Sequence, residues 1–355
     1  MEAVLNGLSA TQQRFEIGDP SQVSYARRGI SELAHSIGCS ETVIGRLAII
    51  VTECATNQLK HAQRGELLVR PISESPSRYG IELLAIDSGP GIRDLHACFV
   101  DGYTTAGSSG NGMGAIQRLA DELDIWSAPG LGTVLRLVVW AEPGPAVAEL
   151  RGPIEYGAIN LPLEGETLCG DAWTCSYTEG EFTVMVADGL GHGGLAHSAA
   201  VAATATFARL GPSSVEEIVV ASHEALRPTR GAALGVARIP TQAAAHGAPS
   251  VARFCGVGNI AASVWTPYGH RHLVSHAGIV GHQLRKAQEF QVNWPQDGLL
   301  IVHSDGLATR WDLSRYPGLT LRHPTLVAAT LYRDFARGRD DVTVFVARAL
   351  HAESP

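Results

Sequence analysis

Two stretches near the N-terminus repeat apolar residues at helical spacing. The first, residues 21–38, has apolar side chains at positions 23, 26, 30, 33, 34 and 37 and ends in a glycine. The second begins at Ser40, whose side chain suits a helix cap, and keeps the helical spacing to residue 61 or 62. Both patterns predict amphipathic helices.

Four polar residues of the second predicted helix fall on one stripe. They are Glu53, Asn57, Lys60 and His61, at i, i+4, i+7 and i+8. A stripe of this kind is either the solvated edge of the helix or a row of functional groups. The spacing alone leaves both interpretations open.

Strand-like runs follow at residues 66–71 and 80–86. The second run ends in Asp87-Ser-Gly89-Pro-Gly91, an acid at a strand end followed by glycines that let a ligand approach the backbone. A loop rich in Gly and Ser, residues 104–114, then leads into a predicted helix over 115–123. Because glycines at a helix N-terminus expose N–H groups and the positive end of the helix dipole, this loop suits a phosphate chain.

The pattern breaks between residues 140 and 155, where three prolines and two glycines interrupt any periodicity. A chain of 355 residues is longer than one core usually supports. We therefore predict two domains, 1–141 and 156–355, joined by a linker over 142–155. A surface loop inside one large domain is the alternative.

The second half is rich in predicted strands, near 180–187, 232–239, 251–257, 260–266, 298–303 and 342–348, with helices at 194–208 and 215–226. Carboxylates stand beside these strands at four stations. They are Asp171, Asp188, Asp305 and the pair Asp340-Asp341. Oxygen ligands of this kind favour a site for a hard cation.

Composition narrows the classes of partner. The charged fraction is 17%, the hydrophobic fraction is 45%, and no apolar run approaches the ~20 residues of a membrane-spanning helix. The net charge of -8 argues against nucleic acid as a partner, since phosphate contacts need clustered Lys and Arg. Six cysteines without a CxxC pair fit reduced thiols, and the start lacks an export signal. We expect a cytoplasmic protein that binds neither membrane nor nucleic acid.

Three elements of the first half carry a family resemblance through their order. The helix with Glu53 and Asn57, the segment Asp87–Gly91 and the loop Gly107–Gly114 resemble the N, G1 and G2 boxes of the GHKL ATPase/kinase superfamily. The Glu-xxx-Asn-xx-Lys-His pattern is similar to that of the anti-sigma-factor and switch serine kinases of bacterial stress and sporulation pathways. The resemblance covers roughly residues 15–140 and implies an N-terminal Bergerat-type α/β sandwich.

This resemblance implies an ATP site with Mg²⁺. Asn57 would ligate the Mg²⁺ that bridges the phosphates, and Asp87 would accept a hydrogen bond from the adenine amino group. Glu53 would be the base that takes the proton from an attacking serine hydroxyl. The remaining nucleotide-binding positions implied are Lys60, His61, Gly89, Gly91, Gly110, Gly112, Gly114 and Thr133.

The second half carries its own resemblance. The second half has, in order, Gly170-Asp171, Asp188-Gly189-Leu-Gly191-His192-Gly193, Gly256-Val-Gly258-Asn259, Ser304-Asp305-Gly306 and Asp340-Asp341-Val-Thr343. This order resembles the PP2C-type metal-dependent phosphatases of the SpoIIE/RsbX branch. It covers about residues 155–350. It implies a C-terminal α-β-β-α sandwich with the acids at one end, and hence an α+β two-domain chain.

By this resemblance Asp188 bridges two Mn²⁺ or Mg²⁺ ions. The Gly189 carbonyl and Asp171 would complete one ion, and Asp305 with Asp340 or Asp341 the other. Such a pair lowers the pKa of a shared water and holds phosphate oxygens. His192 is a candidate proton donor to the leaving serine oxygen, while a purely structural histidine in a Gly-rich turn is the alternative.

Together the two resemblances imply a bifunctional regulator, an ATP-dependent serine kinase fused to a phosphoserine phosphatase. The implied substrate is a STAS-domain antagonist protein of sigma-factor partner switching, and a homodimer is one option for assembly. A different interpretation makes the N-terminal domain a non-catalytic module that binds nucleotide or a partner. A scaffold with both sites inactive is disfavoured, because neither set of acids and glycines lacks a member.

Overall fold

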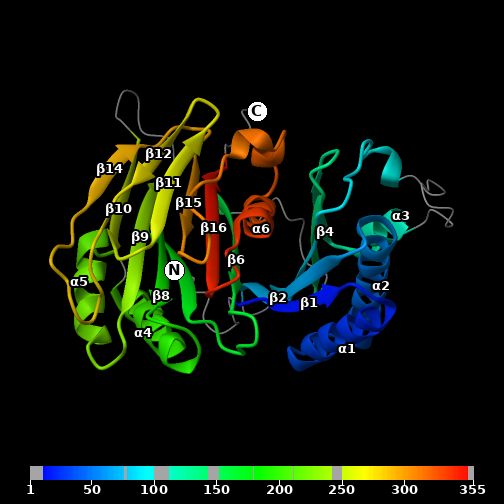
Figure 1. The fold of residues 1–355 in the computed structure, drawn as a ribbon, viewed down its shortest axis with the longest axis horizontal. Coiled ribbons are helices and arrows are strands. Elements are labelled where there is room, and N and C mark those ends of the chain that lie inside the picture. The colour runs from blue at the N-terminus through cyan, green and yellow to red at the C-terminus, as the bar shows by residue number, and fades with distance from the viewer. Residues whose placement is uncertain are drawn as a thin grey trace. The chain divides into compact units, whose positions relative to one another are not determined.

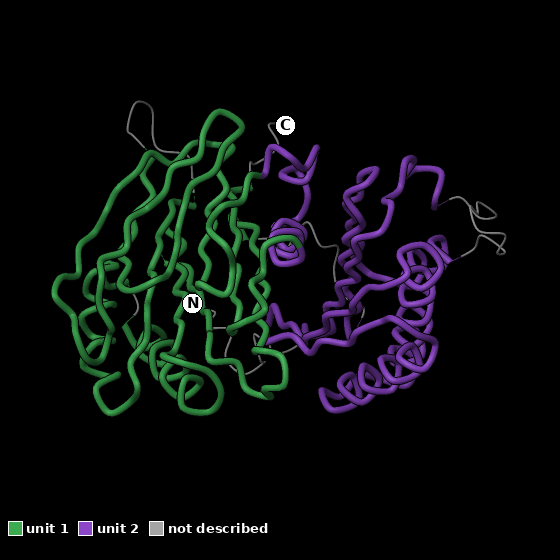
Figure 2. Tube along the Cα trace, viewed as in Figure 1, with its two compact units in different colours: residues 1–4, 151–312, 334–355 green, residues 5–150, 313–333 purple. Residues whose placement is uncertain are grey.

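The computed structural model describes residues 11–75, 78–99, 112–142, 152–178, 180–210, 212–241 and 250–350 (Figure 1). The chain divides into two compact units. Unit 1 comprises residues 1–4, 151–312 and 334–355, and unit 2 comprises residues 5–150 and 313–333 (Figure 2). The division after residue 150 falls within the predicted linker, of which residues 143–151 lie outside the described residues. The sequence analysis did not anticipate that residues 313–333 group with unit 2.

Unit 2 is built on one antiparallel sheet of five strands in the order β1-β2-β3-β5-β4. The strands are β1 (Gln13–Ile17), β2 (Gly65–Ser75), β3 (Arg78–Asp87), β4 (Glu122–Ser127) and β5 (Thr133–Trp140). The helical elements are α1 (Pro20–Ser36), α2 (Glu41–Asn57), the π-helical turn η1 (Gln58–Ala62), the 3₁₀ turn η2 (Ala97–Phe99) and α3 (Gly112–Leu119).

Helix caps and apolar faces explain the first two helices. The Asp19 side chain accepts hydrogen bonds from the backbone N–H groups of Ser21 and Gln22, and Ser40 Oγ accepts one from Val43 N, so both helices begin at capped positions. Their apolar stripes pack on one face of the sheet in a common core. Buried members of this core include Ile30, Leu47, Ile50, Leu67, Leu83 and Leu137. The two predicted amphipathic helices are therefore confirmed.

The second predicted helix ends where the sequence suggested, but its last turn is of a different type. After α2 ends at Asn57, the π-helical turn η1 continues to Ala62 and carries the exposed Lys60 and His61. The predicted helix over 115–123 was too long. α3 ends at Leu119, because residues from 122 onward pair with β5 as strand β4.

Residues 313–333 lie on the sheet face opposite α1 and α2. They contain the short turns η4 (Leu313–Arg315) and η5 (Leu319–Leu321) and most of helix α6 (Pro324–Phe335). Trp126 Nε1 donates to the carbonyl oxygen of Pro317 at 2.9 Å, and His323 N donates to Asp124 Oδ2 at 2.8 Å. Both strand residues alternate with Ile125, which faces the helix side, so this segment covers the other face (Figure 2).

Unit 1 contains two sheets. One has the order β13-β10-β9-β8-β7 with β14 also paired to β10, and the other has the order β12-β11-β15-β16-β6. The strands are β6 (Ile154–Leu161), β7 (Asp171–Thr178), β8 (Glu181–Gly189), β9 (Ala232–Pro240), β10 (Val251–Val257), β11 (Ala261–Thr266), β12 (Gly269–Leu273), β13 (Ser275–His276), β14 (Phe290–Asn293), β15 (Leu299–His303) and β16 (Val342–Ala349).

The two sheets pack face to face. Their shared core contains buried side chains of both, including Phe182, Val184, Phe254, Leu300 and Phe345. The outer face of the first sheet is covered by α4 (Gly194–Leu210) and α5 (Val215–Leu226) through a second apolar cluster. The predicted helices and strands of this half are confirmed with small shifts at their ends. This is the two-domain α+β architecture expected from the sequence.

Two further expectations concern cysteines and helices. All six cysteines are buried and free. Within the described ranges, no helix has the length and apolar character needed to cross a membrane.

Candidate active sites

Two of the predicted acids in unit 1 lie opposite each other on neighbouring strands. Asp171, the first residue of β7, and Asp188, at the end of β8, are direct partners in the antiparallel register. Gly189 N donates to Gly170 O at 3.0 Å and closes the end of the pair. A Cβ atom on Gly189 would lie 2.1 Å from the carbonyl oxygen of Ala196 in α4, so only glycine lets β8 pass this close to the helix.

The remaining acids come from the other sheet. Asp305 follows β15, and its Oδ2 accepts a hydrogen bond of 2.5 Å from Asn259 Nδ2. Asp341 precedes β16, is 2% exposed, and its Oδ1 accepts from Leu163 N at 2.8 Å. Asp340 Oδ1 in turn accepts from Asp341 N at 2.9 Å. Backbone and amide donors therefore orient three of the carboxylates.

These acids share one electrostatic environment. Burial raises the pKa of Asp188, and the negative charges of Asp171, Asp305, Asp340 and Asp341 raise it further. Burial also raises the pKa of Asp171, with a smaller contribution from the charge of Asp341. The pKa values of Asp340 and Asp341 are raised for the same reason. The other four predicted carboxylates thus all lie within electrostatic reach of Asp188.

The donor set fits a divalent cation. The buried Oδ2 atoms of Asp171 and Asp341 have no hydrogen-bond partner among the described residues. A buried carboxylate oxygen without a donor is costly unless a cation faces it. As placed, no group of three His, Cys, Asp or Glu side chains in the described ranges has the spacing of a closed metal shell. The fit therefore rests on the two unpartnered oxygens and on the mutual repulsion of the acids.

His192 occupies the turn between β8 and α4, where it is exposed. Its Nδ1 lies 2.7 Å from Glu166 Oε1, in the loop between β6 and β7. The charge of His192 partly opposes the rise in the pKa values of Asp340 and Asp341, so the ring is within electrostatic reach of these two acids. The sequence indicated His192 but not Glu166.

The candidate phosphate end of the unit 2 site brings two sequence motifs together. A Cβ atom on Gly112, the first residue of α3, would lie 2.6 Å from Glu53 Oε2 and 3.7 Å from the Asn57 amide. Asn57 Nδ2 also lies 3.7 Å from Met113 Sδ. A side chain at residue 112 would therefore collide with Glu53, so glycine lets the start of α3 pack closely against Glu53 and Asn57.

The candidate adenine end lies where β3 finishes. Asp87 pairs with Thr133 in register, and its Oδ1 accepts from Gly89 N at 2.8 Å. Burial raises the pKa of Asp87, while the backbone N–H groups of Gly89 and Thr133 and the charges of Arg333 and His61 oppose this rise. Gly91 has φ of 71°, and a Cβ atom there would lie 2.0 Å from Ala128 O. Glycine is thus required for the close turn below Asp87.

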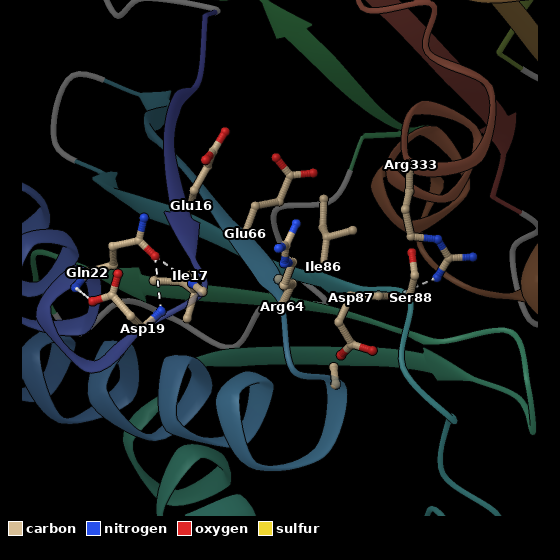
Figure 3. Close-up of a pocket in the computed structure, with 13 residues that line it drawn as sticks. Glu16, Ile17, Asp19, Gln22, Arg64, Glu66, Ile86, Asp87, Ser88 and Arg333 are labelled. Carbon is tan, nitrogen blue, oxygen red and sulfur yellow. Dashed lines mark hydrogen bonds between the residues drawn. The ribbon is translucent and has the colours of Figure 1, made fainter.

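A cavity of about 650 Å³ opens beside Asp87. Figure 3 shows that strand ends and helix α6 both contribute to its lining, with Asp87 and Arg333 on the same side. Arg333 Nη1 donates to the backbone oxygen of Asp87 at 3.0 Å. The acidic residues that line the cavity are Glu16, Asp19, Glu66 and Asp87, and the basic ones are Arg64 and Arg333.

The predicted positions differ in how far the structure describes them. Gly110 lies outside the described residues. Gly114 is buried within α3, and Lys60 and His61 are exposed.

The sequence assigned no role to four polar residues that hydrogen-bond to the candidate site residues or to the strands beside them. They are Gln58, which donates to the carbonyls of Glu66 and Ile86, Asn259 on Asp305, Glu166 on His192 and Arg333 on Asp87. Asn259 had a signal, since it ends the segment Gly-Val-Gly-Asn, but no role followed from the pattern.

Comparison with known proteins gives relatives of two kinds. Residues 18–139 match the family model of the histidine kinase-like ATPase domain. The chain is 29% identical over 115 residues to the serine/threonine-protein kinase RsbT of Bacillus subtilis (strain 168), a match that covers 32% of this chain and 86% of RsbT. It is 26% identical over 155 residues to the phosphoserine phosphatase RsbX of the same organism, covering 43% of this chain and 75% of RsbX.

Among solved structures, the crystal structure of RsbX in complex with magnesium aligns with a TM-score of 0.49 and 22% identity. This alignment covers 56% of the present chain and 96% of the RsbX chain. Both resemblances stated from the sequence are thereby confirmed: residues 18–139 match the histidine kinase-like ATPase domain, and the chain has a serine kinase and a phosphoserine phosphatase among its relatives.

Proposed function

We propose that the C-terminal domain is a Mn²⁺- or Mg²⁺-dependent phosphoserine phosphatase of the PP2C type. The observation that carries this proposal is the Asp171–Asp188 pair. A buried Asp171 and a partly buried Asp188 face each other in strand register, burial and like charge raise both pKa values, and Asp171 Oδ2 has no hydrogen-bond partner among the described residues. With both carboxylates ionised, such an arrangement is stable only when positive charge compensates it.

In this proposal the ions are held by the side chains of Asp171, Asp188, Asp305, Asp340 and Asp341 and by the Gly189 carbonyl. When bound, two such ions would supply positive charge for the phosphate oxygens and lower the pKa of a water between them. The chain itself orients the carboxylates through Asn259 and Leu163. His192 would donate a proton to the serine oxygen as that oxygen leaves phosphorus.

We propose further that the N-terminal domain binds ATP with Mg²⁺ and transfers phosphate to serine. Asn57 would hold Mg²⁺, Asp87 would accept from the adenine amino group, and Glu53 would take the proton of the serine hydroxyl. The close approach of Gly112 to Glu53 supports this assignment, because it brings the glycine-rich start of α3 beside the candidate base and the candidate Mg²⁺ ligand. Gly89, Gly91, Gly110, Gly114, Thr133, Lys60 and His61 would complete the nucleotide site.

The proposed substrate is a STAS-domain antagonist protein, phosphorylated by one domain and dephosphorylated by the other. The relatives RsbT and RsbX, named as a serine/threonine-protein kinase and a phosphoserine phosphatase, support opposing activities on serine. The STAS domain of the substrate is what the family resemblance of the sequence implies. The setting would be bacterial stress or sigma-factor partner switching in the cytoplasm. A homodimer would be compatible with this function.

A second candidate makes the N-terminal domain a binding module without phosphoryl transfer. The contact between Arg333 and Asp87 is the observation that favours this candidate, because a segment from the second half of the sequence contacts the candidate adenine end of the site. In that case only the phosphatase is an enzyme, and nucleotide binding regulates it.

One experiment tests both proposals. The purified chain is incubated with ATP, Mg²⁺ and STAS-domain proteins, and phosphoserine is followed before and after Mn²⁺ is added. We expect phosphoserine to form and then to be removed. Asp188→Asn should lose removal but keep formation, since an amide does not supply the charge that holds two cations. Near-normal hydrolysis by Asp188→Asn would contradict the two-metal proposal.

A further inference from the structure

His192 has one hydrogen-bond partner among the described residues, the carboxylate of Glu166. Its Nδ1 lies 2.7 Å from Glu166 Oε1, while Nε2 on the other side of the ring makes no hydrogen bond to a described residue. The histidine side chain is 57% exposed and the glutamate 33% exposed. A histidine whose Nδ1 donates to a carboxylate is held in one tautomer and one ring orientation, with Nε2 directed outward.

The backbone brings Glu166 to this position. Glu166 N donates to Leu163 O at 2.9 Å, and Leu163 N donates to Asp341 Oδ1 at 2.8 Å, so the loop is fastened to one of the candidate metal-binding acids. The turn that carries His192 also packs closely against the Glu166 carboxylate. Gly193 has φ of 71°, and a Cβ atom there would lie 3.1 Å from Glu166 Oε2. Glycine therefore lets the carboxylate approach the turn that carries His192.

The start of α4 is tied to the same loop. His197 Nδ1 lies 2.8 Å from the carbonyl oxygen of Cys169, two residues before Asp171. The loop from residue 163 to 170 thus connects Asp341, His192, α4 and Asp171 in one short stretch of chain. A change at Glu166 alters the orientation of His192 without removing a carboxylate from the acid cluster.

We infer that Glu166 is a positioning residue for leaving-group protonation by His192. This inference rests on the proposed phosphatase function. Glu166 holds Nδ1–H, so that Nε2–H faces the serine oxygen that leaves. In the step, a bond forms between the water oxygen and phosphorus, and the bond between phosphorus and serine Oγ breaks. The proton on His192 Nε2 passes to Oγ, the imidazolium becomes neutral imidazole, and the proton released by the water reaches solvent.

A positioning role and a merely structural role predict different dependence on the leaving group. The serine alkoxide is strongly basic and needs a proton as it leaves, whereas 4-nitrophenolate is a weak base and leaves without one. Loss of the Glu166–His192 contact should therefore slow hydrolysis of an alkyl phosphate far more than that of an aryl phosphate. A general loss of loop structure should slow both to the same extent.

The experiment compares Glu166→Gln with the parent on a phosphoserine peptide and on 4-nitrophenyl phosphate, with Mn²⁺ saturating. The glutamine amide donates as well as accepts, so it no longer selects the tautomer with a proton on Nδ1. We expect kcat on the peptide to fall by about 10- to 100-fold and kcat on the aryl phosphate to change less than about threefold. His192→Ala should show the same selectivity, and the double variant should lose little more than His192→Ala alone, because the two residues act together.

Glu164→Gln is the matched control, since it makes the same chemical change two residues away in the same loop. It should leave both rates near those of the parent. Glu166→Asp keeps the negative charge but has a shorter side chain. Thermal unfolding of all variants in Mn²⁺ reports whether a substitution in this loop destabilises the fold.

Three results would overturn the inference while leaving the phosphatase proposal intact. Glu166→Gln could lower kcat equally on the two phosphates, the double variant could lose as much as the two single variants combined, or Glu164→Gln could lower kcat as much as Glu166→Gln. A parent protein that hydrolyses neither phosphate in Mn²⁺ would overturn both.

Discussion

Arg333 Nη1 donates a hydrogen bond of 3.0 Å to the backbone oxygen of Asp87, the residue whose side chain is the candidate acceptor for adenine. The hydroxyl of the preceding residue, Tyr332, donates a hydrogen bond of 3.2 Å to Glu66 Oε2. Two consecutive residues of α6 thus contact the ends of β2 and β3. In the sequence, only seven residues lie between Tyr332 and Asp340, the first acid of the last candidate metal-binding pair.

Arg333→Ala should weaken ATP binding by about threefold to tenfold. The guanidinium charge lowers the pKa of Asp87, and removing that charge makes the buried carboxyl a poorer acceptor at neutral pH. Calorimetric titration of parent and variant with ATP and Mg²⁺ measures the difference.

Arg322→Ala is the control for this change, because Arg322 lies in the same segment and pairs with Asp124 at 3.3 Å instead of with Asp87. Its ATP affinity should match the parent. An equal loss in both variants would assign the effect to general loosening of the segment and not to Asp87.

Regular, half-buried elements were predictable from the sequence, and α6 was not. The stripe of α1 alternates buried residues such as Ala26 and Ile30 with exposed ones, which is the pattern that periodicity detects. In α6, the residues from Pro324 to Tyr332 are all buried. A helix buried on every side has no polar face, so neither its spacing nor its place in the fold is visible in the pattern.

The acids and glycines of the candidate sites could be predicted from the sequence. The residues that orient these acids could not. Asp171 and Asp188 each stand at a strand end beside a glycine, which is a local signal. The contact of Glu166 with His192 joins residues 26 apart, and that of Arg333 with Asp87 joins residues 246 apart. Such contacts depend on tertiary packing that no short motif records.

Asp171→Asn should raise the thermal midpoint of the protein in a chelator by about 2–4 °C, because it removes one of two facing buried charges. Mn²⁺ should raise the midpoint of the parent, since binding to the folded state alone stabilises it, and should raise that of the variant much less. Thermal unfolding with and without Mn²⁺ tests this.

Asp297→Asn provides the comparison for that experiment, because Asp297 is exposed and lies before β15, away from the acid pair. It should follow the parent in both conditions. Equal stabilisation of Asp171→Asn and parent by Mn²⁺ would remove Asp171 from the proposed ligands.

Glu66→Gln should change how stability depends on pH. Burial raises the pKa of Glu66 from 4.5 to about 7 in the folded protein, with Arg14 and Tyr332 partly opposing the rise. The folded state therefore keeps the proton between these values while the unfolded state loses it. Between pH 4.5 and 7 the free energy of unfolding falls by up to ~3 kcal/mol owing to this group, and above pH 7 it falls no further.

The glutamine variant lacks this slope, so it should gain stability relative to the parent at pH 8 and not at pH 4.5. Urea unfolding of both proteins at the two pH values measures the difference. A constant difference between parent and variant at both pH values would show that Glu66 titrates normally in the folded state.

Glu53→Gln separates a serine kinase from a nucleotide-binding module. Glu53 and Asn57 lie one helical turn apart on α2, and Gly112 at the start of α3 packs beside both. If Glu53 is the base, the glutamine variant keeps the shape and the ATP affinity but loses the proton acceptor, and phosphoryl transfer to serine should slow by about 10²- to 10⁴-fold. ATP affinity and phosphoserine formation are measured on the same preparations. Loss of transfer with unchanged affinity supports the kinase, equal transfer by both proteins removes Glu53 from the mechanism, and no transfer by the parent to any STAS serine supports the binding module.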